Sequence, residues 1–101
     1  MYTIQFVSID HGGTIEERIV DDRMEAMWMA AGMDILDYQG SLIWEVEINI
    51  RQALRNLRAA PDYFISQFEM IKGDYHDVES LMEWMLEIAE DTPDLQVEVL
   101  Y

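Results

Sequence analysis

Two short groups of polar residues could take part in chemistry, and each contains one of the two histidines of the chain. Asp10-His11-Gly12-Gly13 places a carboxylate next to an imidazole, a pairing that general acid–base catalysis uses. Asp74, His76, Asp77 and Glu79 offer oxygen and nitrogen ligands to a metal ion. These groups are the strongest candidates for catalysis or metal binding.

Neither group has the remaining parts of a reactive site. Adjacent side chains in a tight turn point apart, and no nucleophile accompanies the first group. The second group lacks the glycine turn and the alternating ligands of a calcium loop, and neither histidine has a partner at zinc-ligand spacing. The sequence also has no cysteine and no glycine-rich phosphate loop. We therefore expect no catalytic residue, no metal, no cofactor and no enzymatic activity.

A line of carboxylates is the most distinct charge pattern. Asp77 is a typical helix cap, and a helix from 78 to 91 would place its glutamates within an arc of about 80°, opposite an apolar stripe. These residues, here called the acidic ridge, are Glu79, Glu83, Glu87 and Glu90. The predicted segment contains no lysine or arginine to relieve their repulsion, and Asp91 adds a negative charge where the helix dipole favours a cation. If this surface binds a cationic partner, the clustered negative charges have a function. If it is merely a solvated helix face, their repulsion has none.

The partner-binding hypothesis extends beyond the ridge. Trp84 lies on the flank of the predicted helix, either as a shoulder of the core or as an exposed interface anchor. One helix carries a carboxylate about every 6 Å, too sparse to imitate phosphates about 3.4 Å apart along a DNA strand. A second acidic element is therefore required. The candidate partner-binding residues are Glu79, Glu83, Trp84, Glu87, Glu90 and Asp91, with Asp21, Asp22 and Glu25, or else Glu45 and Glu47, as the second element.

The overall charge limits the kinds of partner. The chain has 21 acidic and 6 basic residues, giving a formal net charge of −15. Such a surface repels nucleic acid and anionic membranes and attracts cationic proteins. The charge is −8 over residues 1–50, +2 over 51–73 and −9 over 74–101. Arg51, Arg55 and Arg58 lie in the basic middle at helical spacing, and we interpret them as internal counter-charges for the acidic flanks.

The first third of the chain predicts a β-hairpin and a helix. Residues 2–9 and 14–20 are rich in β-branched residues or alternate in polarity, and the glycines between them suit a turn with positive φ angles. We therefore expect Gly13→Val to disturb folding and His11→Ala to be tolerated. Asp21 or Asp22 can cap a helix that ends near Ala31, with Gly32 as its stop.

The remainder of the chain predicts helices and a final strand. Residues 42–59 fit an apolar helical stripe after a Ser41 cap, although 42–49 also alternates as a strand would. Pro61 begins a third helix that reaches Ile71 before Gly73, the helix from 78 to 91 follows, and residues 95–101 alternate as a strand. The predicted fold is α+β, with a three-stranded antiparallel sheet covered by three to four helices.

A length of 101 residues suits one domain, 1–101. The sequence shows no membrane-spanning run and no secretory signal, and together with the absence of cysteine this favours the cytoplasm, or the host cytoplasm if the protein is viral.

Three function classes fit these features. The first is an inhibitor that occupies the basic nucleic-acid-binding surface of a target, as viral or mobile-element proteins do against CRISPR, restriction or transcription machinery. The second is an immunity protein or antitoxin that neutralises a basic toxin. The third is a non-catalytic assembly module, such as a homodimer. For the first two, lysines in place of Glu83 and Glu87 should weaken binding without lowering stability.

Overall fold

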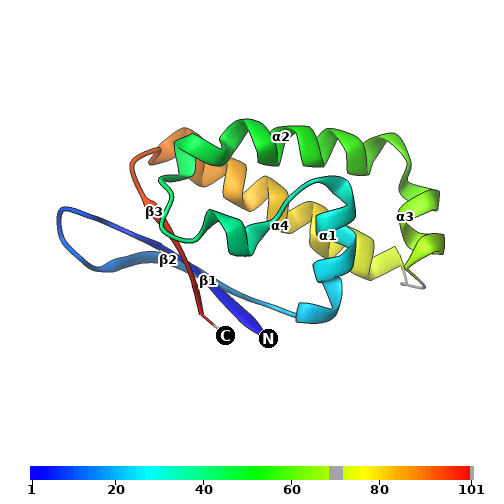
Figure 1. Ribbon diagram of the computed structural model, residues 1–101, viewed down its shortest axis with the longest axis horizontal. Coiled ribbons are helices and arrows are strands. Elements are labelled where there is room, and N and C mark those ends of the chain that lie inside the picture. Colours follow the sequence, from blue (N-terminus) through cyan, green and yellow to red (C-terminus); the bar gives the residue numbers. More distant parts are fainter. Residues whose placement is uncertain (69–71, 101) are drawn as a thin grey trace.

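The computed structural model describes residues 1–68 and 72–100, and it confirms the predicted α+β class. A small sheet lies below a layer of helices (Figure 1). The strands are β1 (Tyr2–Val7), β2 (Thr14–Val20) and β3 (Gln96–Leu100); the helices are α1 (Glu25–Ala31), α2 (Ile43–Ala59), α3 (Pro61–Gln67) and α4 (Lys72–Asp91), with the short 3-10 turns η1 (Asp22–Met24) and η2 (Ile35–Tyr38). Among the described residues, no helix has both the length and the apolarity that a bilayer span requires.

The sheet has the strand order β2-β1-β3, and both pairings are antiparallel, so the predicted hairpin and final strand are confirmed. The positive φ lies at Gly12, at +69°, whereas Gly13 adopts an ordinary angle. The expected conformational constraint at Gly13 was therefore wrong by one residue. Valine is disfavoured at position 12, where a side chain meets a left-handed backbone.

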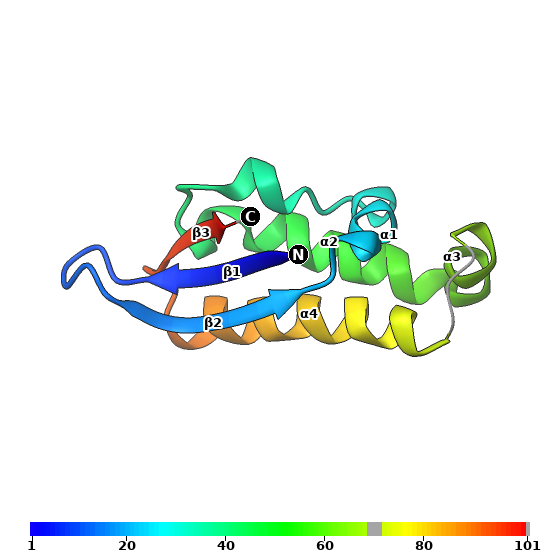
Figure 2. The ribbon, with the colours of Figure 1, turned by 90° about the horizontal axis from the view of Figure 1, so that it is seen from below.

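The helices cover only one face of the sheet. Ile4 and Phe6 of β1 and Val97 and Val99 of β3 are buried beneath them, and these side chains join the buried faces of the helices in a hydrophobic core. The alternate residues point to the opposite face, which is the face seen in Figure 2. The sheet therefore has one covered face and one open face.

The two edges of the sheet differ. Along the outer edge of β3, the Gly40 N–H donates to the Val97 carbonyl and the Val97 N–H donates to the Ser41 carbonyl, both at 2.8 Å. The side chain of Gln39 accepts a hydrogen bond from the Val99 N–H at 2.6 Å. The segment before α2 thus pairs with the β3 edge, while β2 forms the other edge.

The helix predicted over 42–59 is confirmed as α2, Ile43–Ala59, and the alternative strand over 42–49 was wrong. Buried Val46, Ile50 and Leu57 lie on the side of α2 that faces the core, because helical spacing brings them together. The predicted Ser41 cap was also wrong. Leu42 occupies the cap position, and its N–H donates to the Glu45 side chain at 2.9 Å.

The boundaries of the last two helices needed larger corrections. α3 ends at Gln67, and the predicted end at Ile71 lies outside the described residues. Gly73, predicted as a stop, and Asp77, predicted as a cap, are both inside α4, which begins at Lys72. One cause is tertiary packing, because buried Tyr75 donates a hydrogen bond to the Leu57 carbonyl at 3.0 Å and ties the first turns of α4 to α2.

Candidate protein-binding surface

The acidic ridge lies on the side of α4 away from the core, but the structure divides it into two halves. Arg58 of α2 donates from Nε to Glu79 Oε2 at 2.8 Å and also forms an ion pair with Glu83. The hydrogen bond from Arg58 lowers the pKa of the Glu79 carboxyl below its ordinary value, and a hydrogen bond from His76 acts in the same direction. The first half of the ridge is therefore partly neutralised within the protein, with one guanidinium shared by two carboxylates.

Two of the three arginines of α2 confirm the counter-charge interpretation. Arg58 bridges to α4, and Arg51 pairs with Glu47 at 2.6 Å, one turn earlier on its own helix. Arg55 is exposed, and the described part of the structure shows no ion pair for it. Arg51 also removes Glu47 from the pool of unpaired carboxylates, while Glu45 is used in capping α2.

The second half of the ridge retains its charge. Glu87, Glu90 and Asp91 are exposed, and within residues 1–68 and 72–100 none of them forms an ion pair. They occupy the end of α4, where the helix dipole adds partial negative charge. The negative potential of α4 is therefore concentrated at its carboxyl end.

Two further carboxylates approach this end of α4. Asp10 in the hairpin turn and Asp94 after the helix line the same hollow as Asp91, with a volume of about 540 Å³. We call this hollow, together with Glu87 and Glu90, the acidic end. Its remaining lining is mainly aliphatic: Ser8, Ile9, Leu42, Thr92, Pro93 and Leu95. The sequence prediction missed Asp10 and Asp94 because they are distant in the chain from the ridge and follow no helical spacing.

Trp84 is a shoulder of the core rather than an exposed anchor. It is half-buried, and its ring makes an edge contact with Phe6 at a centroid distance of 5.2 Å. The Arg18 guanidinium lies 5.5 Å from the centre of the same ring. Arg18 also donates two hydrogen bonds to Ser80, at 3.2 Å each, and so fastens β2 to α4.

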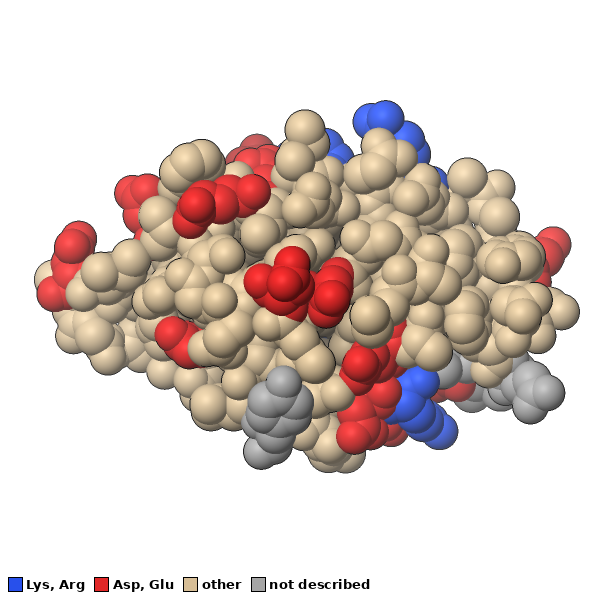
Figure 3. Space-filling view, in the orientation of Figure 1, with Lys and Arg blue, Asp and Glu red and all other residues tan. Residues whose placement is uncertain are grey.

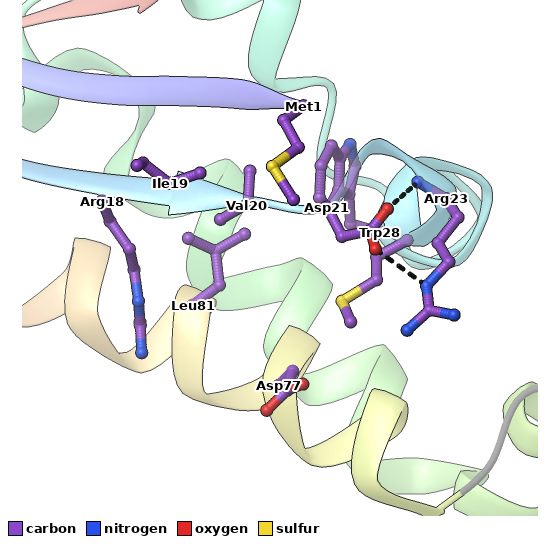
Figure 4. A pocket seen from close by; sticks show the side chains of 10 residues that line it. Met1, Arg18, Ile19, Val20, Asp21, Arg23, Trp28, Asp77 and Leu81 are labelled. Carbon is purple, nitrogen blue, oxygen red and sulfur yellow. Dashed lines mark hydrogen bonds and ion pairs between the residues drawn. The ribbon is translucent and has the colours of Figure 1, made fainter.

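The second predicted acidic element does not continue the ridge. Asp21 pairs with Arg23 at 3.0 Å, Asp22 pairs with the terminal amine of Met1 at 3.2 Å, and Glu25 accepts a hydrogen bond from Tyr2. Figure 4 shows Asp21 and Arg23 beside a hollow of about 390 Å³, with Asp77 on the facing helix. Asp77 precedes Glu87 by ten residues, or about 15 Å along the helix axis. The group of Asp21, Asp22 and Glu25 therefore lies near the first half of α4, away from the acidic end.

Other acidic residues are scattered. On the face shown in Figure 3, acidic side chains form several groups separated by uncharged surface, with basic side chains at the margins. The part of the chain that the structure describes contains no group of three histidine, cysteine or acidic residues arranged to hold a metal ion. His11 lies exposed in the hairpin turn, and His76 contacts Glu79 at 3.5 Å. The backbone N–H of His11, rather than its imidazole, donates to the Ser8 hydroxyl at 3.3 Å.

The comparisons with known proteins give no match. No family model, no curated protein and no solved structure matches this chain. The charges and contacts of the chain itself therefore carry the evidence for its function.

Proposed function

We propose that the protein is an acidic inhibitor that occupies the basic, nucleic-acid-binding surface of another protein, and that it acts in the cytoplasm, or in the host cytoplasm if it is viral. The observation that carries this proposal is the acidic end. Arg18, Arg23, Arg51 and Arg58 all bond to groups of the protein itself, so few cations remain to pair with the other carboxylates of a chain that has 21 acidic residues. The unpaired carboxylates are left to attract a cationic partner.

The composition of the hollow suits the side chains of such a partner. Lysine and arginine have apolar stems and charged heads. The aliphatic groups of Ile9, Leu42 and Leu95 can contact a stem, while Asp91 and Asp94 can accept hydrogen bonds from the head. A basic nucleic-acid-binding surface presents side chains of this kind.

The resemblance to nucleic acid is one of charge rather than of regular spacing. Pairing with Arg58 offsets one of the two negative charges of Glu79 and Glu83, leaving less charge than a phosphate strand would present over the same length. Carboxylates at the acidic end come from the hairpin turn, α4 and the following loop. They can therefore compete for cationic side chains without reproducing a duplex.

The test combines capture with competition. The immobilised protein is exposed to an extract of its host at low and at high salt, and each retained protein is purified and assayed with a labelled DNA duplex and a labelled RNA. We expect a retained protein that binds nucleic acid, releases it when this protein is added, and loses affinity for this protein as salt rises.

A matched pair of variants assigns the surface. Glu90→Gln with Asp91→Asn removes two charges from the acidic end, and we expect the affinity to fall roughly five- to thirtyfold on the basis of exposed ion-pair energies. The control, Asp37→Asn with Asp62→Asn, removes two exposed charges elsewhere and should change affinity by less than about threefold. A partner that keeps its nucleic acid would refute the inhibitor proposal. If that partner is instead a toxin that loses its toxicity, the immunity class replaces the inhibitor class.

A further inference from the structure

The outer edge of β2 presents backbone groups that no other strand uses. The backbone groups of Val97 in β3 bond outward, to Gly40 and Ser41. Its neighbours in the strand therefore bond inward to β1, Gln96 to Val7 and Glu98 to Gln5. Hydrogen bonding alternates along a strand, so Ile4 and Phe6 bond to the other neighbour, β2.

The same alternation fixes the direction of the groups of β2. Ile4 and Phe6 pair with Arg18 and Glu16, whose N–H and C=O groups therefore point towards β1. The N–H and C=O groups of the alternate residues of β2, Glu17 and Ile19, point away from the sheet. Within residues 1–68 and 72–100, no backbone hydrogen bond from outside the strands reaches β2. This edge is open, in contrast to the edge of β3.

An acidic side of α4 runs beside this open edge. Asp77, Ser80, Trp84, Glu87 and Asp91 follow one another in steps of three and four residues, which places them on one side of the helix. That side faces β2, because Ser80 accepts both hydrogen bonds from Arg18. Figure 2 shows α4 extending alongside β2. Three carboxylates therefore follow the edge over about 21 Å, a length similar to that of β2.

The charged side chains of β2 do not neutralise the negative potential beside its open edge. Glu16 is exposed and points to the helix side of the sheet, as its partner Phe6 does. Arg18 is the cation of β2, but its guanidinium is held against Ser80 and the Trp84 ring, beneath the sheet rather than at its edge. On the opposite side, Ile19 leaves 67% of its surface exposed, and Ile15, at the irregularity between the Phe6–Glu16 and Val7–Thr14 pairs, leaves 54% exposed.

We infer that β2 accepts an extended cationic segment of the partner protein as a fourth strand. The segment uses the outward N–H and C=O groups of Glu17 and Ile19. Its side chains alternate, with lysine or arginine towards Glu16 and Glu87 and an apolar residue beside Ile19. Main-chain hydrogen bonds supply affinity in strand addition, and alternating side chains supply specificity. The inference rests on the proposed function, since both require a cationic partner, but it adds the β2 edge that adjoins the acidic end and assigns a backbone mechanism.

Charge complementarity selects this occupant over a second copy of the chain. Pairing of β2 with its own copy about a twofold axis at Glu17 would set two glutamates directly opposite each other. It would also bring together the acidic sides of two α4 helices, each in a chain of charge −15. A cationic strand, in contrast, is attracted to the same surface.

The test uses the full chain and the peptide acetyl-Lys-Val-Arg-Val-Lys-Val-Arg-amide, which has the alternation that the edge demands. The backbone control is the same peptide with alternate amides N-methylated, so that its charge is kept while its donors are lost. Nuclear magnetic resonance titration reports the site of binding. We expect the amide signals of Glu17 and Ile19 to shift, their exchange with solvent to slow by about tenfold or more, and the N-methylated peptide to bind about tenfold more weakly or worse.

Protein variants test the charge along the edge. Asp77→Asn with Glu87→Gln should weaken peptide binding roughly five- to thirtyfold, whereas Asp37→Asn with Asp62→Asn should change it by less than about threefold. Equal binding of the N-methylated peptide, or shifts confined to other elements, would overturn strand addition. So would a dependence of the Glu17 and Ile19 signals on protein concentration alone, because that result assigns the edge to a second copy.

The two proposals fail in different ways. If the peptide leaves β2 unprotected while a captured partner still depends on Glu90 and Asp91, strand addition alone is wrong. If β2 binds the peptide as expected but the captured partner keeps its nucleic acid, only the inhibitor proposal is wrong.

Discussion

Two single substitutions one turn apart on α4 test whether Arg58 divides the acidic ridge. Glu83→Lys and Glu87→Lys change the net charge equally, and from the sequence alone each would replace repulsion along the helix with attraction. In the structure, Glu83 pairs with Arg58, whereas Glu87 has its like-charged neighbours Glu83 and Asp91 one turn away on either side. We therefore expect Glu87→Lys, and not Glu83→Lys, to stabilise the fold.

The magnitude follows from these neighbours. At position 87, two repulsive pairs of about 0.2–0.5 kcal/mol become attractive by similar amounts, a gain of roughly 1 kcal/mol. A cation near the end of α4 adds a few tenths of a kcal/mol through the helix dipole. At position 83, the new attractions to Glu79 and Glu87 are offset because an ion pair of about 0.2–1 kcal/mol is lost and the new cation faces Arg58. The expected net change there is close to zero or unfavourable.

Thermal and chemical denaturation of the two variants measure this difference. For a domain of this size, 1 kcal/mol corresponds to about 4–8 °C in Tm. Glu87→Lys should therefore melt several degrees above Glu83→Lys at low salt, and the difference should shrink as salt screens the exposed charges. Equal stabilisation by both substitutions would mean that Arg58 does not neutralise Glu83 in solution, and that the ridge is continuous after all.

Further expectations follow from single contacts. Arg58→Gln should lower the stability of the fold near neutral pH. Because the pKa of Glu79 is lowered in the folded state, the native chain should lose its advantage over the variant as pH falls from about 4.5 through that lowered pKa. Urea denaturation at several pH values measures this difference. Gly12→Val should lower the unfolding free energy by roughly 1–2 kcal/mol, whereas Gly13→Val should have little effect, because only Gly12 has a positive φ. Trp84→Ala should cost about 2–4 kcal/mol in the same assay, since it removes the ring between Phe6 and Arg18. The native protein should pass through a duplex DNA column at physiological salt, and retention would contradict its acidic character.

The sequence predicts those elements whose own periodicity is strong. The stripe Val46, Ile50 and Leu57 predicts α2 correctly, and the glycine-rich turn predicts the hairpin. The start of α4 was predicted six residues late, at 78 instead of Lys72, because Asp77 is a favourable cap residue in local terms. The bond from Tyr75 to Leu57 depends on helix packing, and no local pattern reveals it.

The candidate site was only partly predictable for a similar reason. Helical spacing alone places Glu79, Glu83 and Glu87 on one side of α4, and the structure agrees. Whether a carboxylate is neutralised depends on which arginine of α2 faces it, and that depends on how two helices pack. Asp10 and Asp94 join the acidic end because the hairpin turn and the loop after α4 meet at one hollow. Such convergence of distant segments has no signature in a single sequence.

The carboxylates near β2 also affect whether its open edge pairs with other chains. An unpaired edge that carries Ile15 and Ile19 invites association with other chains, and natural sheets commonly protect such edges with charge. Here Glu16 and Glu17 lie on the strand, while Asp77 and Glu87 lie on the adjacent helix. Negative charge on both elements repels a second acidic copy and attracts a cationic strand. The same residues can therefore keep the free protein from self-pairing and select its partner, so their neutralisation should weaken partner binding and promote self-association together.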